Sequence, residues 1–317
     1  MKRLFVFLSL AAAAMFAQAG TGLEAENLPV SKSAKGVEYW LCAGQSNMQM
    51  GWGAFNRTPE EKARVRSEME RLEKVDVALW DFNTGKWTVL DAKSGLAKSA
   101  FAVSFAIRRA EATGKAVRIL YMAAGGAPTE SFLSKERMRS VTPGGGFRYP
   151  RLAAIANNPG SIDRNPDFPC AWVAREYPRR KANREEAYWW PVSAMYEAGV
   201  KVVHSSAIEL AGILWYQGES NATTCVRPDV PTPRAYQEET LRAVIDELRG
   251  GKDVPFVMMG LPKMNRPWEP YREVQRQVSA EKGVIFVDTF AAGLGDMNDV
   301  HPRNKIPFAE VAVRALR

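Results

Sequence analysis

A serine stands in a short polar turn directly after an apolar run near the start of the chain. The run from Val37 to Ala43 is typical of a buried strand, and Gly44-Gln45-Ser46-Asn47-Met48 follows it. Such a turn lifts a serine hydroxyl out of a sheet, where a base can take its proton and make it a nucleophile. The same pattern occurs in ordinary turns, so the rest of the chain must supply a base and groups that stabilise an oxyanion.

The chain contains only two histidines that can serve as this base, His204 and His301. Histidine is the usual general base near neutral pH. His301 follows the last strand-like run, whereas His204 precedes its strand and is expected at the opposite edge of the sheet. We therefore favour His301 as the partner of Ser46. The alternative is a surface histidine in the turn that Pro302 makes.

Hydrogen-bond donors are also needed, because the tetrahedral intermediate of acyl transfer carries a negatively charged oxygen. The candidates are the N–H of Ser46, the backbone of Gly125 and Gly126, and the side-chain amide of Gln217 or Asn221. The alternative for the glycines is a tight turn, and for the amides it is the capping of a loop.

The elements that must position these residues alternate between strand-like and helical runs. Strands are predicted at residues 37–43, 75–80, 117–123, 212–216, 254–260 and 284–288. Helices are predicted at residues 59–74, 101–113, 190–198, 233–249, 270–282 and 307–316. Strands separated by helices imply parallel βαβ units and a three-layer α/β/α sandwich around a central parallel sheet. The polar clusters follow strands, and sites in such sheets lie beyond the carboxyl ends of the strands.

Five motifs of the chain resemble those of a known family. The chain resembles the sialate O-acetylesterase family, a carbohydrate-esterase branch of the SGNH (GDSL-like) hydrolases. The resemblance runs from about residue 37 to residue 316. The motifs that carry it are Gly44-Gln45-Ser46-Asn47-Met48, Gly125-Gly126-Ala127-Pro128, Trp215-Tyr216-Gln217-Gly218-Glu219-Ser220-Asn221, Tyr271-Arg272-Glu273-Val274-Gln275-Arg276 and Asp299-Val300-His301-Pro302-Arg303-Asn304-Lys305.

The resemblance implies a flavodoxin-like SGNH hydrolase fold and the removal of O-acetyl groups from a carbohydrate, either sialic acid or another acetylated glycan, without a cofactor. Ser46 would form an acetyl-enzyme, with His301 acting first as base and then as acid. The N–H groups of Ser46 and Gly126 and the Gln217 amide would form the oxyanion hole. Further positions expected to contact the substrate or to support these groups are Gln45, Gly125, Glu219 and Asn221.

Two departures from the wider superfamily concern the groups around the base and the amide. The superfamily places Asp three residues before the histidine, where this chain has Asn298. Asp299 matches the Asp-x-His-Pro pattern of this branch, so it either completes a catalytic triad or stabilises a turn beside a Ser–His dyad. Asn221 lies three residues after Gly218 instead of two, which makes Gln217 the favoured amide donor.

The amino-terminal residues have the pattern of a secretory signal peptide. Met1-Lys2-Arg3 precedes an apolar run from Leu4 to Phe16, and Ala17-Gln18-Ala19 provides a cleavage site. We expect residues 1–19 to be removed on export to a secreted or periplasmic location, residues 20–36 to form a linker, and residues 37–317 to form the esterase domain. No other segment is apolar enough to cross a membrane, so no membrane association is expected after removal of the signal.

Residues 130–190 are predicted to form a long loop insertion, because they contain Gly144-Gly145-Gly146, many prolines and little periodicity. We expect this insertion to shape the subsites for the sugar. Cys170 and Cys225 lie in loop-like sequence and can pair in an oxidising compartment, but the sequence leaves their pairing open. Candidates for sugar-stacking walls, although tryptophan more often belongs to a core, are Trp52, Trp189, Trp190 and Trp215.

Composition limits the other classes of function. The 317 residues are 46% hydrophobic and 25% charged, which is typical of a globular protein with a sizeable core. The net charge of +8 is dispersed, and its densest patch, residues 175–184, lacks any nucleic-acid-binding motif. The chain has neither Cys-x-x-Cys nor His-Glu-x-x-His, so no catalytic zinc is expected. The rival functions are a catalytically inactive carbohydrate-binding protein of the same fold and a lipase or acyl transferase of the superfamily. The sequence does not indicate the oligomeric state.

Overall fold

The computed structural model describes residues 21–141, 195–225 and 234–317. A central sheet of seven strands has the order β3-β2-β4-β1-β5-β6-β7. All neighbouring strands are parallel except β3, which pairs antiparallel with β2. The strands are β1 Val37–Gly44, β2 Val77–Asp81, β3 Lys86–Val89, β4 Ala116–Ala123, β5 Leu210–Tyr216, β6 Phe256–Met259 and β7 Ile285–Val287.

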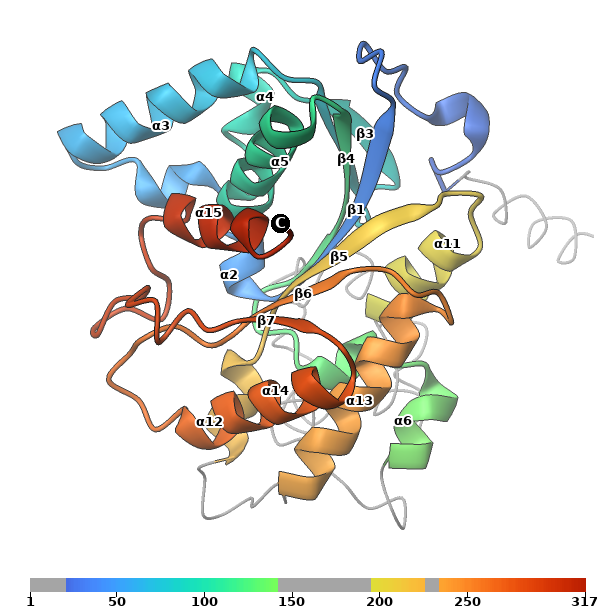
Figure 1. The fold of residues 1–317 in the computed structure, drawn as a ribbon, viewed down its shortest axis with the longest axis vertical. Coiled ribbons are helices and arrows are strands. Elements are labelled where there is room, and N and C mark those ends of the chain that lie inside the picture. Colours follow the sequence, from blue (N-terminus) through green and yellow to red (C-terminus); the bar gives the residue numbers. More distant parts are fainter. Residues whose placement is uncertain (1–20, 142–194, 226–233) are drawn as a thin grey trace, which may run out of the picture.

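Helices cover both faces of the sheet, as Figure 1 shows: α3, α4, α5 and α15 lie on one side, and α11, α13 and α14 lie on the other. This arrangement confirms the predicted α/β/α sandwich. The α-helices are α2 Ser46–Gln49, α3 Pro59–Leu72, α4 Ala92–Gly95, α5 Ala100–Thr113, α6 Lys135–Val141, α11 Lys201–His204, α12 Glu219–Cys225, α13 Arg234–Arg249, α14 Glu269–Glu281 and α15 Ile306–Arg314. Short helical turns lie at Ala25–Asn27, Trp52–Phe55, Thr129–Phe132 and Tyr196–Val200.

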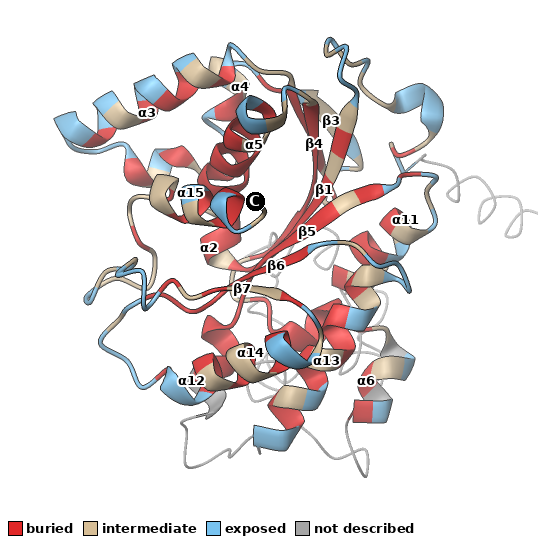
Figure 2. Cartoon of the chain, viewed as in Figure 1, coloured by how far each residue is buried: buried red, intermediate tan, exposed pale blue. Residues whose placement is uncertain are grey.

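Alternate residues of the central strands fill two hydrophobic cores, one on each face of the sheet. In β1, Leu41 and Ala43 belong to the core under α13 and α14, whereas Trp40 and Cys42 belong to the core under α5 and α15. Because both faces are covered, the central strands are buried along most of their length, and they are drawn mostly in red in Figure 2. This explains why they read as apolar runs without alternation.

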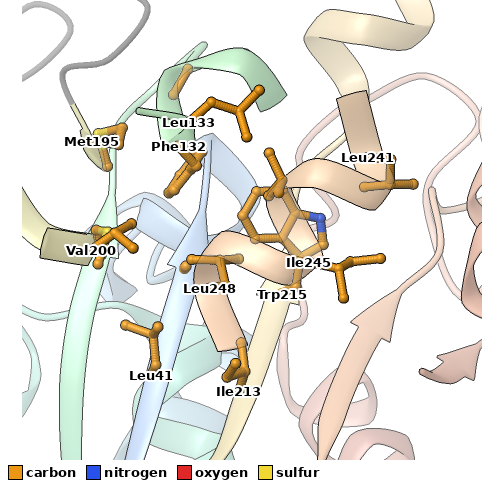
Figure 3. Packing of buried hydrophobic residues seen from close by; sticks show 14 of the residues in the cluster. Leu41, Phe132, Leu133, Met195, Val200, Ile213, Trp215, Leu241, Ile245 and Leu248 are labelled. Carbon is orange, nitrogen blue, oxygen red and sulfur yellow. The ribbon is translucent and has the colours of Figure 1, made fainter. Parts of the chain in front are cut away.

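Trp215 of β5 lies fully buried in the first core, where its ring packs edge-to-face on Phe132 with centroids 4.8 Å apart (Figure 3). Trp52 is also buried, with 2% of its surface exposed. These two tryptophans are therefore core residues, and the expectation that they form sugar-stacking walls is wrong for both. Trp189 and Trp190 lie outside the described residues.

Several predicted features lie partly or wholly outside the described residues. The predicted insertion begins with ordered structure, since a helical turn at Thr129–Phe132 and α6 precede residue 142. Residues 142–190 of the insertion, the signal peptide and Cys170 lie outside the described residues, and the side chain of Cys225 is likewise not described. The pairing of Cys170 with Cys225 therefore stays open, and the cleavage of the signal stays a prediction.

The described part of the predicted linker packs on the domain. The carbonyl of Thr21 accepts a hydrogen bond from Trp80 Nε1 at 2.9 Å, and that of Gly22 accepts one from Trp87 Nε1 at 2.7 Å. Leu23 is buried in the first core. In the described residues no helix has the length and apolar character needed to cross a bilayer.

Candidate active site at the carboxyl ends of the strands

The nucleophile turn, named here for Ser46, the predicted nucleophile, begins at Gly44, where β1 lies against β5. A Cβ on Gly44 would lie 2.1 Å from the carbonyl oxygen of Tyr216, so only glycine allows this approach. Gln45 leaves the strand conformation, with φ −117° and ψ −146°, and its N–H donates to the same Tyr216 oxygen at 3.2 Å. Ser46 then opens the short helix α2 and remains partly exposed. The turn thus presents the serine at the carboxyl end of the central strand, as predicted.

The Gln45 side chain ties this turn to the turn after β5. Its Oε1 accepts hydrogen bonds from the backbone N–H of Ser220 at 3.2 Å and from Gln217 Nε2 at 3.4 Å. Its Nε2 donates to Ser46 Oγ at 3.4 Å. The buried Gln45 side chain therefore holds the nucleophile turn against the turn after β5, in agreement with the supporting position expected for it.

The turn after β4 brings the predicted glycine pair to the same end of the sheet. Gly126 has φ +71°, a left-handed conformation that favours glycine, and its carbonyl accepts a hydrogen bond from Ser220 Oγ at 3.2 Å. A Cβ on Gly125 would lie 2.9 Å from Gln49 Oε1 of α2. The role of the Ser46 and Gly126 N–H groups as oxyanion donors stays a prediction.

The Gln217 amide belongs to a buried polar network. Its Nε2 donates to Asn221 Oδ1 at 2.8 Å and to the Ala127 carbonyl at 3.2 Å, and its Oε1 accepts from Thr129 Oγ1 at 2.6 Å. Both hydrogens of the Gln217 amide thus have protein acceptors in this arrangement. Its role as an oxyanion donor stays a prediction, and it requires one of these hydrogen bonds to yield to the substrate oxygen.

Asn221 is the centre of this network, as its burial and its bonds show. Its Nδ2 donates to Glu130 Oε2 at 3.0 Å and to Gln237 Oε1 at 3.1 Å, and its Oδ1 accepts from the Thr129 N–H at 2.9 Å. Glu130 also accepts from Tyr236 Oη at 3.1 Å, and burial raises the pKa of its carboxyl. Asn221 therefore holds the Gln217 amide in place by accepting its hydrogen bond.

His301 follows β7 in a loop that returns towards β1. The loop is anchored beside β6, where the Asn265 N–H donates to the Met297 carbonyl at 3.1 Å. Farther along, Asn47 Nδ2 of α2 donates to the Val300 carbonyl at 2.9 Å. This bond joins the residue that follows Ser46 to the residue that precedes His301. The described residues record no hydrogen bond between the Ser46 hydroxyl and the His301 imidazole.

Asp299 stabilises the turn that carries the histidine. Its Oδ1 accepts a hydrogen bond from the backbone N–H of His301 at 2.8 Å, whereas the distance from that oxygen to His301 Nδ1 is 3.9 Å. The second distance exceeds hydrogen-bonding range. The geometry matches the turn-forming alternative, and the role of Asp299 as third member of a triad stays a prediction.

The surroundings of the His301 ring favour its neutral form. The ring is half-buried, and burial lowers its pKa below the ordinary 6.5 because it penalises the charged imidazolium. The positive charge of Lys305 lowers the pKa further, and the Asp299 carboxylate opposes this effect. A neutral imidazole is the form that can accept a proton from serine.

His204 lies at the other end of the sheet, as predicted. It precedes Leu210, which pairs with Tyr39 near the amino end of β1, whereas Gly44 at the carboxyl end pairs with Tyr216. The His204 ring Nε2 lies 2.7 Å from the Glu247 carbonyl oxygen. His204 is therefore excluded as the partner of Ser46.

Three buried residues beside the site, Asn47, Glu219 and Lys305, are joined by hydrogen bonds that the sequence does not reveal. Asn47 bonds to Glu219 through Nδ2 and receives a bond from Lys305 Nζ through Oδ1. Burial raises the pKa of Glu219 and lowers that of Lys305 to about 7. Asn47 and Lys305 stand inside the recognised motifs, but a polar residue in a motif does not reveal from sequence whether it is buried.

The sheet order and the two helical layers define an α/β/α sandwich. Residues 182–305, less than half of the chain, match the family model described as carbohydrate esterase, sialic acid-specific acetylesterase. This region includes the motif after β5 and the His301 motif. The match agrees with the resemblance that the motifs indicate.

One solved structure agrees on the fold. A carbohydrate acetylesterase from Xanthomonas citri is 18% identical over 88% of this chain, with a TM-score of 0.59. The present chain spans 56% of that protein's length. A protein of Arabidopsis thaliana is 14% identical over 88% of this chain and 97% of its own length, with a TM-score of 0.48. No curated protein sequence matches this chain.

Proposed function

We propose that this protein is an exported serine esterase that removes O-acetyl groups from a carbohydrate through an acetyl-enzyme on Ser46. One observation carries the proposal, namely the hydrogen bond of 2.9 Å from Asn47 to the Val300 carbonyl. It joins the nucleophile turn to the histidine loop, which are separated by most of the chain. The family match supplies the class of substrate, and the apolar run before Gly20 supports export.

The proposed reaction has two halves. The His301 imidazole takes the Ser46 hydroxyl proton as Oγ attacks the acetyl carbonyl carbon, and the N–H groups of Ser46 and Gly126 stabilise the oxyanion. The C–O bond to the sugar then breaks, and the imidazolium gives its proton to the departing sugar oxygen. In the second half, His301 deprotonates a water that attacks the acetyl-enzyme, and acetate leaves while Ser46 regains its proton. The sequence of steps requires no cofactor.

Acetate release tests this function. Wild-type protein should release acetate from an aryl acetate and from at least one acetylated glycan, with O-acetylated sialic acid and acetylated xylan among those screened. Ser46→Ala should lose this activity and keep its fold, and the exposed Ser205→Ala is the matched control that should retain it. Undiminished acetate release by Ser46→Ala would contradict the assignment of the nucleophile.

The rival functions give different results in the same assay. Faster hydrolysis of long-chain than of acetyl esters would indicate a lipase, and transfer of acetyl to an added sugar in preference to water would indicate an acyl transferase. Binding of acetylated glycans by the wild type without any release of acetate would indicate an inactive carbohydrate-binding protein.

A further inference from the structure

We propose that Asn47, Lys305 and Glu219 form a buried positioning cluster that holds the His301 loop against the nucleophile turn. The cluster joins three segments, because Asn47 lies in α2, Glu219 begins α12, and Lys305 immediately precedes α15. This inference rests on the proposed function, since the loop that it positions carries the proposed base. None of the three residues is proposed to touch the substrate.

The orientation of the Asn47 amide follows from its partners. An ammonium group only donates, so Lys305 Nζ must face Oδ1. The Val300 carbonyl only accepts, so it must face Nδ2, which also donates to Glu219 Oε1. The amide thus has both hydrogens and its oxygen engaged while it is fully buried. Rotating it by half a turn would place donor against donor and acceptor against acceptor, so the amide is fixed in the orientation that holds Val300.

Lys305 is placed to fix this amide from within the core. Its side chain has 0% of its surface exposed, and its Nζ lies 5.5 Å from the centroid of the Phe55 ring and 5.7 Å from those of Tyr216 and Phe308. Ring faces attract a cation, but a buried ammonium remains costly. In its charged form Lys305 also acts electrostatically on its surroundings.

This electrostatic effect of the Lys305 charge falls on the histidine that the loop carries. The charged groups that act on Lys305 are the carboxylates of Glu219 and Asp299, which favour its ammonium form. Those that act on His301 are Lys305 and Asp299, with opposite effects. The cluster therefore holds the loop in place through Asn47 and disfavours the protonated imidazole through Lys305.

Proton NMR titration tests the electrostatic part without any substrate. The chain has only two histidines, so the His301 imidazole can be assigned and its titration followed. In Lys305→Met the His301 pKa should shift upward. The exposed Lys62→Met is the matched control and should leave the His301 pKa unchanged. An unchanged His301 pKa in Lys305→Met would overturn this part of the proposal.

Steady-state kinetics test the positioning part. Asn47→Ala should lower kcat by about 100-fold with little change in KM, because a misplacement of about 1 Å in a catalytic group can cost that much. Glu219→Ala should also lower kcat, and Glu219→Gln, which keeps an acceptor oxygen for Asn47, should restore most of the loss. Wild-type kcat in Asn47→Ala, or equal loss in both Glu219 variants, would overturn it.

Two further outcomes separate the possible failures. If Lys305→Met does not fold, Lys305→Gln keeps a donor for Asn47 and removes the charge, and it should show the same upward shift of the His301 pKa. No shift in that variant counts against the cluster. If the wild type releases no acetate while the His301 pKa still responds to Lys305, the proposed function fails and the cluster stands. If acetate is released but neither the pKa nor kcat responds, the cluster fails alone.

Discussion

The buried ammonium of Lys305 predicts a specific dependence of stability on pH. Burial lowers its pKa from 10.5 to about 7 in the folded protein. A group whose folded pKa is depressed in this way binds more protons in the unfolded state, so the free energy of unfolding rises as pH rises between the two values. Replacing Lys305 by Met removes the proton exchange and keeps an apolar side chain of similar length.

The magnitude follows from the two pKa values. With about 1.4 kcal/mol for each pKa unit, the lower pKa of Lys305 in the folded state reduces the free energy of unfolding by about 4 kcal/mol at pH 7 and by about 2 kcal/mol at pH 9. The wild type should therefore gain about 2 kcal/mol of stability relative to Lys305→Met between these pH values. Glu219 acts in the same direction, because its already raised pKa should rise further once the Lys305 charge is gone.

Urea unfolding followed by tryptophan fluorescence at pH 7, 8 and 9 measures this difference. The window lies above the range in which His301 titrates, since its pKa is lowered from 6.5. The exposed Lys62→Met is the matched control, and its stability should change with pH in parallel with the wild type. Parallel curves for the wild type and Lys305→Met would refute the reasoning, because they would mean that the ammonium is not desolvated in the folded protein.

Three other predictions concern the histidine, its neighbour and the nucleophile turn. Because His301 must be neutral to act as base and its pKa is lowered, kcat/KM should rise with pH to a plateau through a midpoint below 6.5; a midpoint above that value would count against the assignment. Asp299→Asn keeps the acceptor for the backbone N–H of His301 and should retain kcat within an order of magnitude, whereas replacing a carboxylate that orients a catalytic histidine costs about 10⁴-fold, which would indicate a triad. Gly44→Ala should destabilise the fold by about 3 kcal/mol in urea unfolding, because its Cβ would lie 2.1 Å from the Tyr216 carbonyl oxygen. Gly53→Ala is the control, since a Cβ on Gly53 meets nothing within 4 Å. A loss of stability in Gly53→Ala as large as that in Gly44→Ala would disprove the steric explanation.

The sequence predicts the layered fold well because its strands and helices are strongly patterned. The predicted strands at residues 37–43 and 117–123 correspond to β1 and β4, and the predicted helix at residues 101–113 corresponds to α5 and ends at Gly114, which adopts φ +72°. Strands that are buried on both faces are necessarily apolar runs, and a glycine after a helix is a reliable stop. These signals are local, so they can be read without the structure.

Several short elements were not predicted, and β3 and α2 show why. β3, Lys86–Val89, is a short edge strand of intermediate and exposed residues, so neither alternation nor a continuous apolar run marks it. α2, Ser46–Gln49, is a helix of four residues without a side-chain cap at Gln45. A helix this short is formed by the tight turn after β1, which is a tertiary constraint, and its own sequence has too few residues to show a helical period.

The placement of the candidate site residues was predictable from the sequence, but their supporting contacts were not. Ser46 and the glycine pair follow strands at the carboxyl edge, and the His301 loop is bonded to the nucleophile turn, as expected from the order of the motifs. By contrast, the burial of Lys305 depends on the packing of three aromatic rings, two of which, Phe55 and Tyr216, are distant in the sequence. Sequence favours the opposite expectation, since lysine is almost never fully buried.

Trapping of the acetyl-enzyme tests the central claim most directly. Wild-type protein mixed with an aryl acetate, quenched in acid within the first turnover and digested with protease should carry one acetyl group on the peptide that contains Ser46. Ser46→Ala should carry none, and Ser205→Ala should be labelled like the wild type. Acetyl found on another residue of the wild type, or acetate release by Ser46→Ala at the wild-type rate, would contradict the claim that Ser46 is the nucleophile of this esterase.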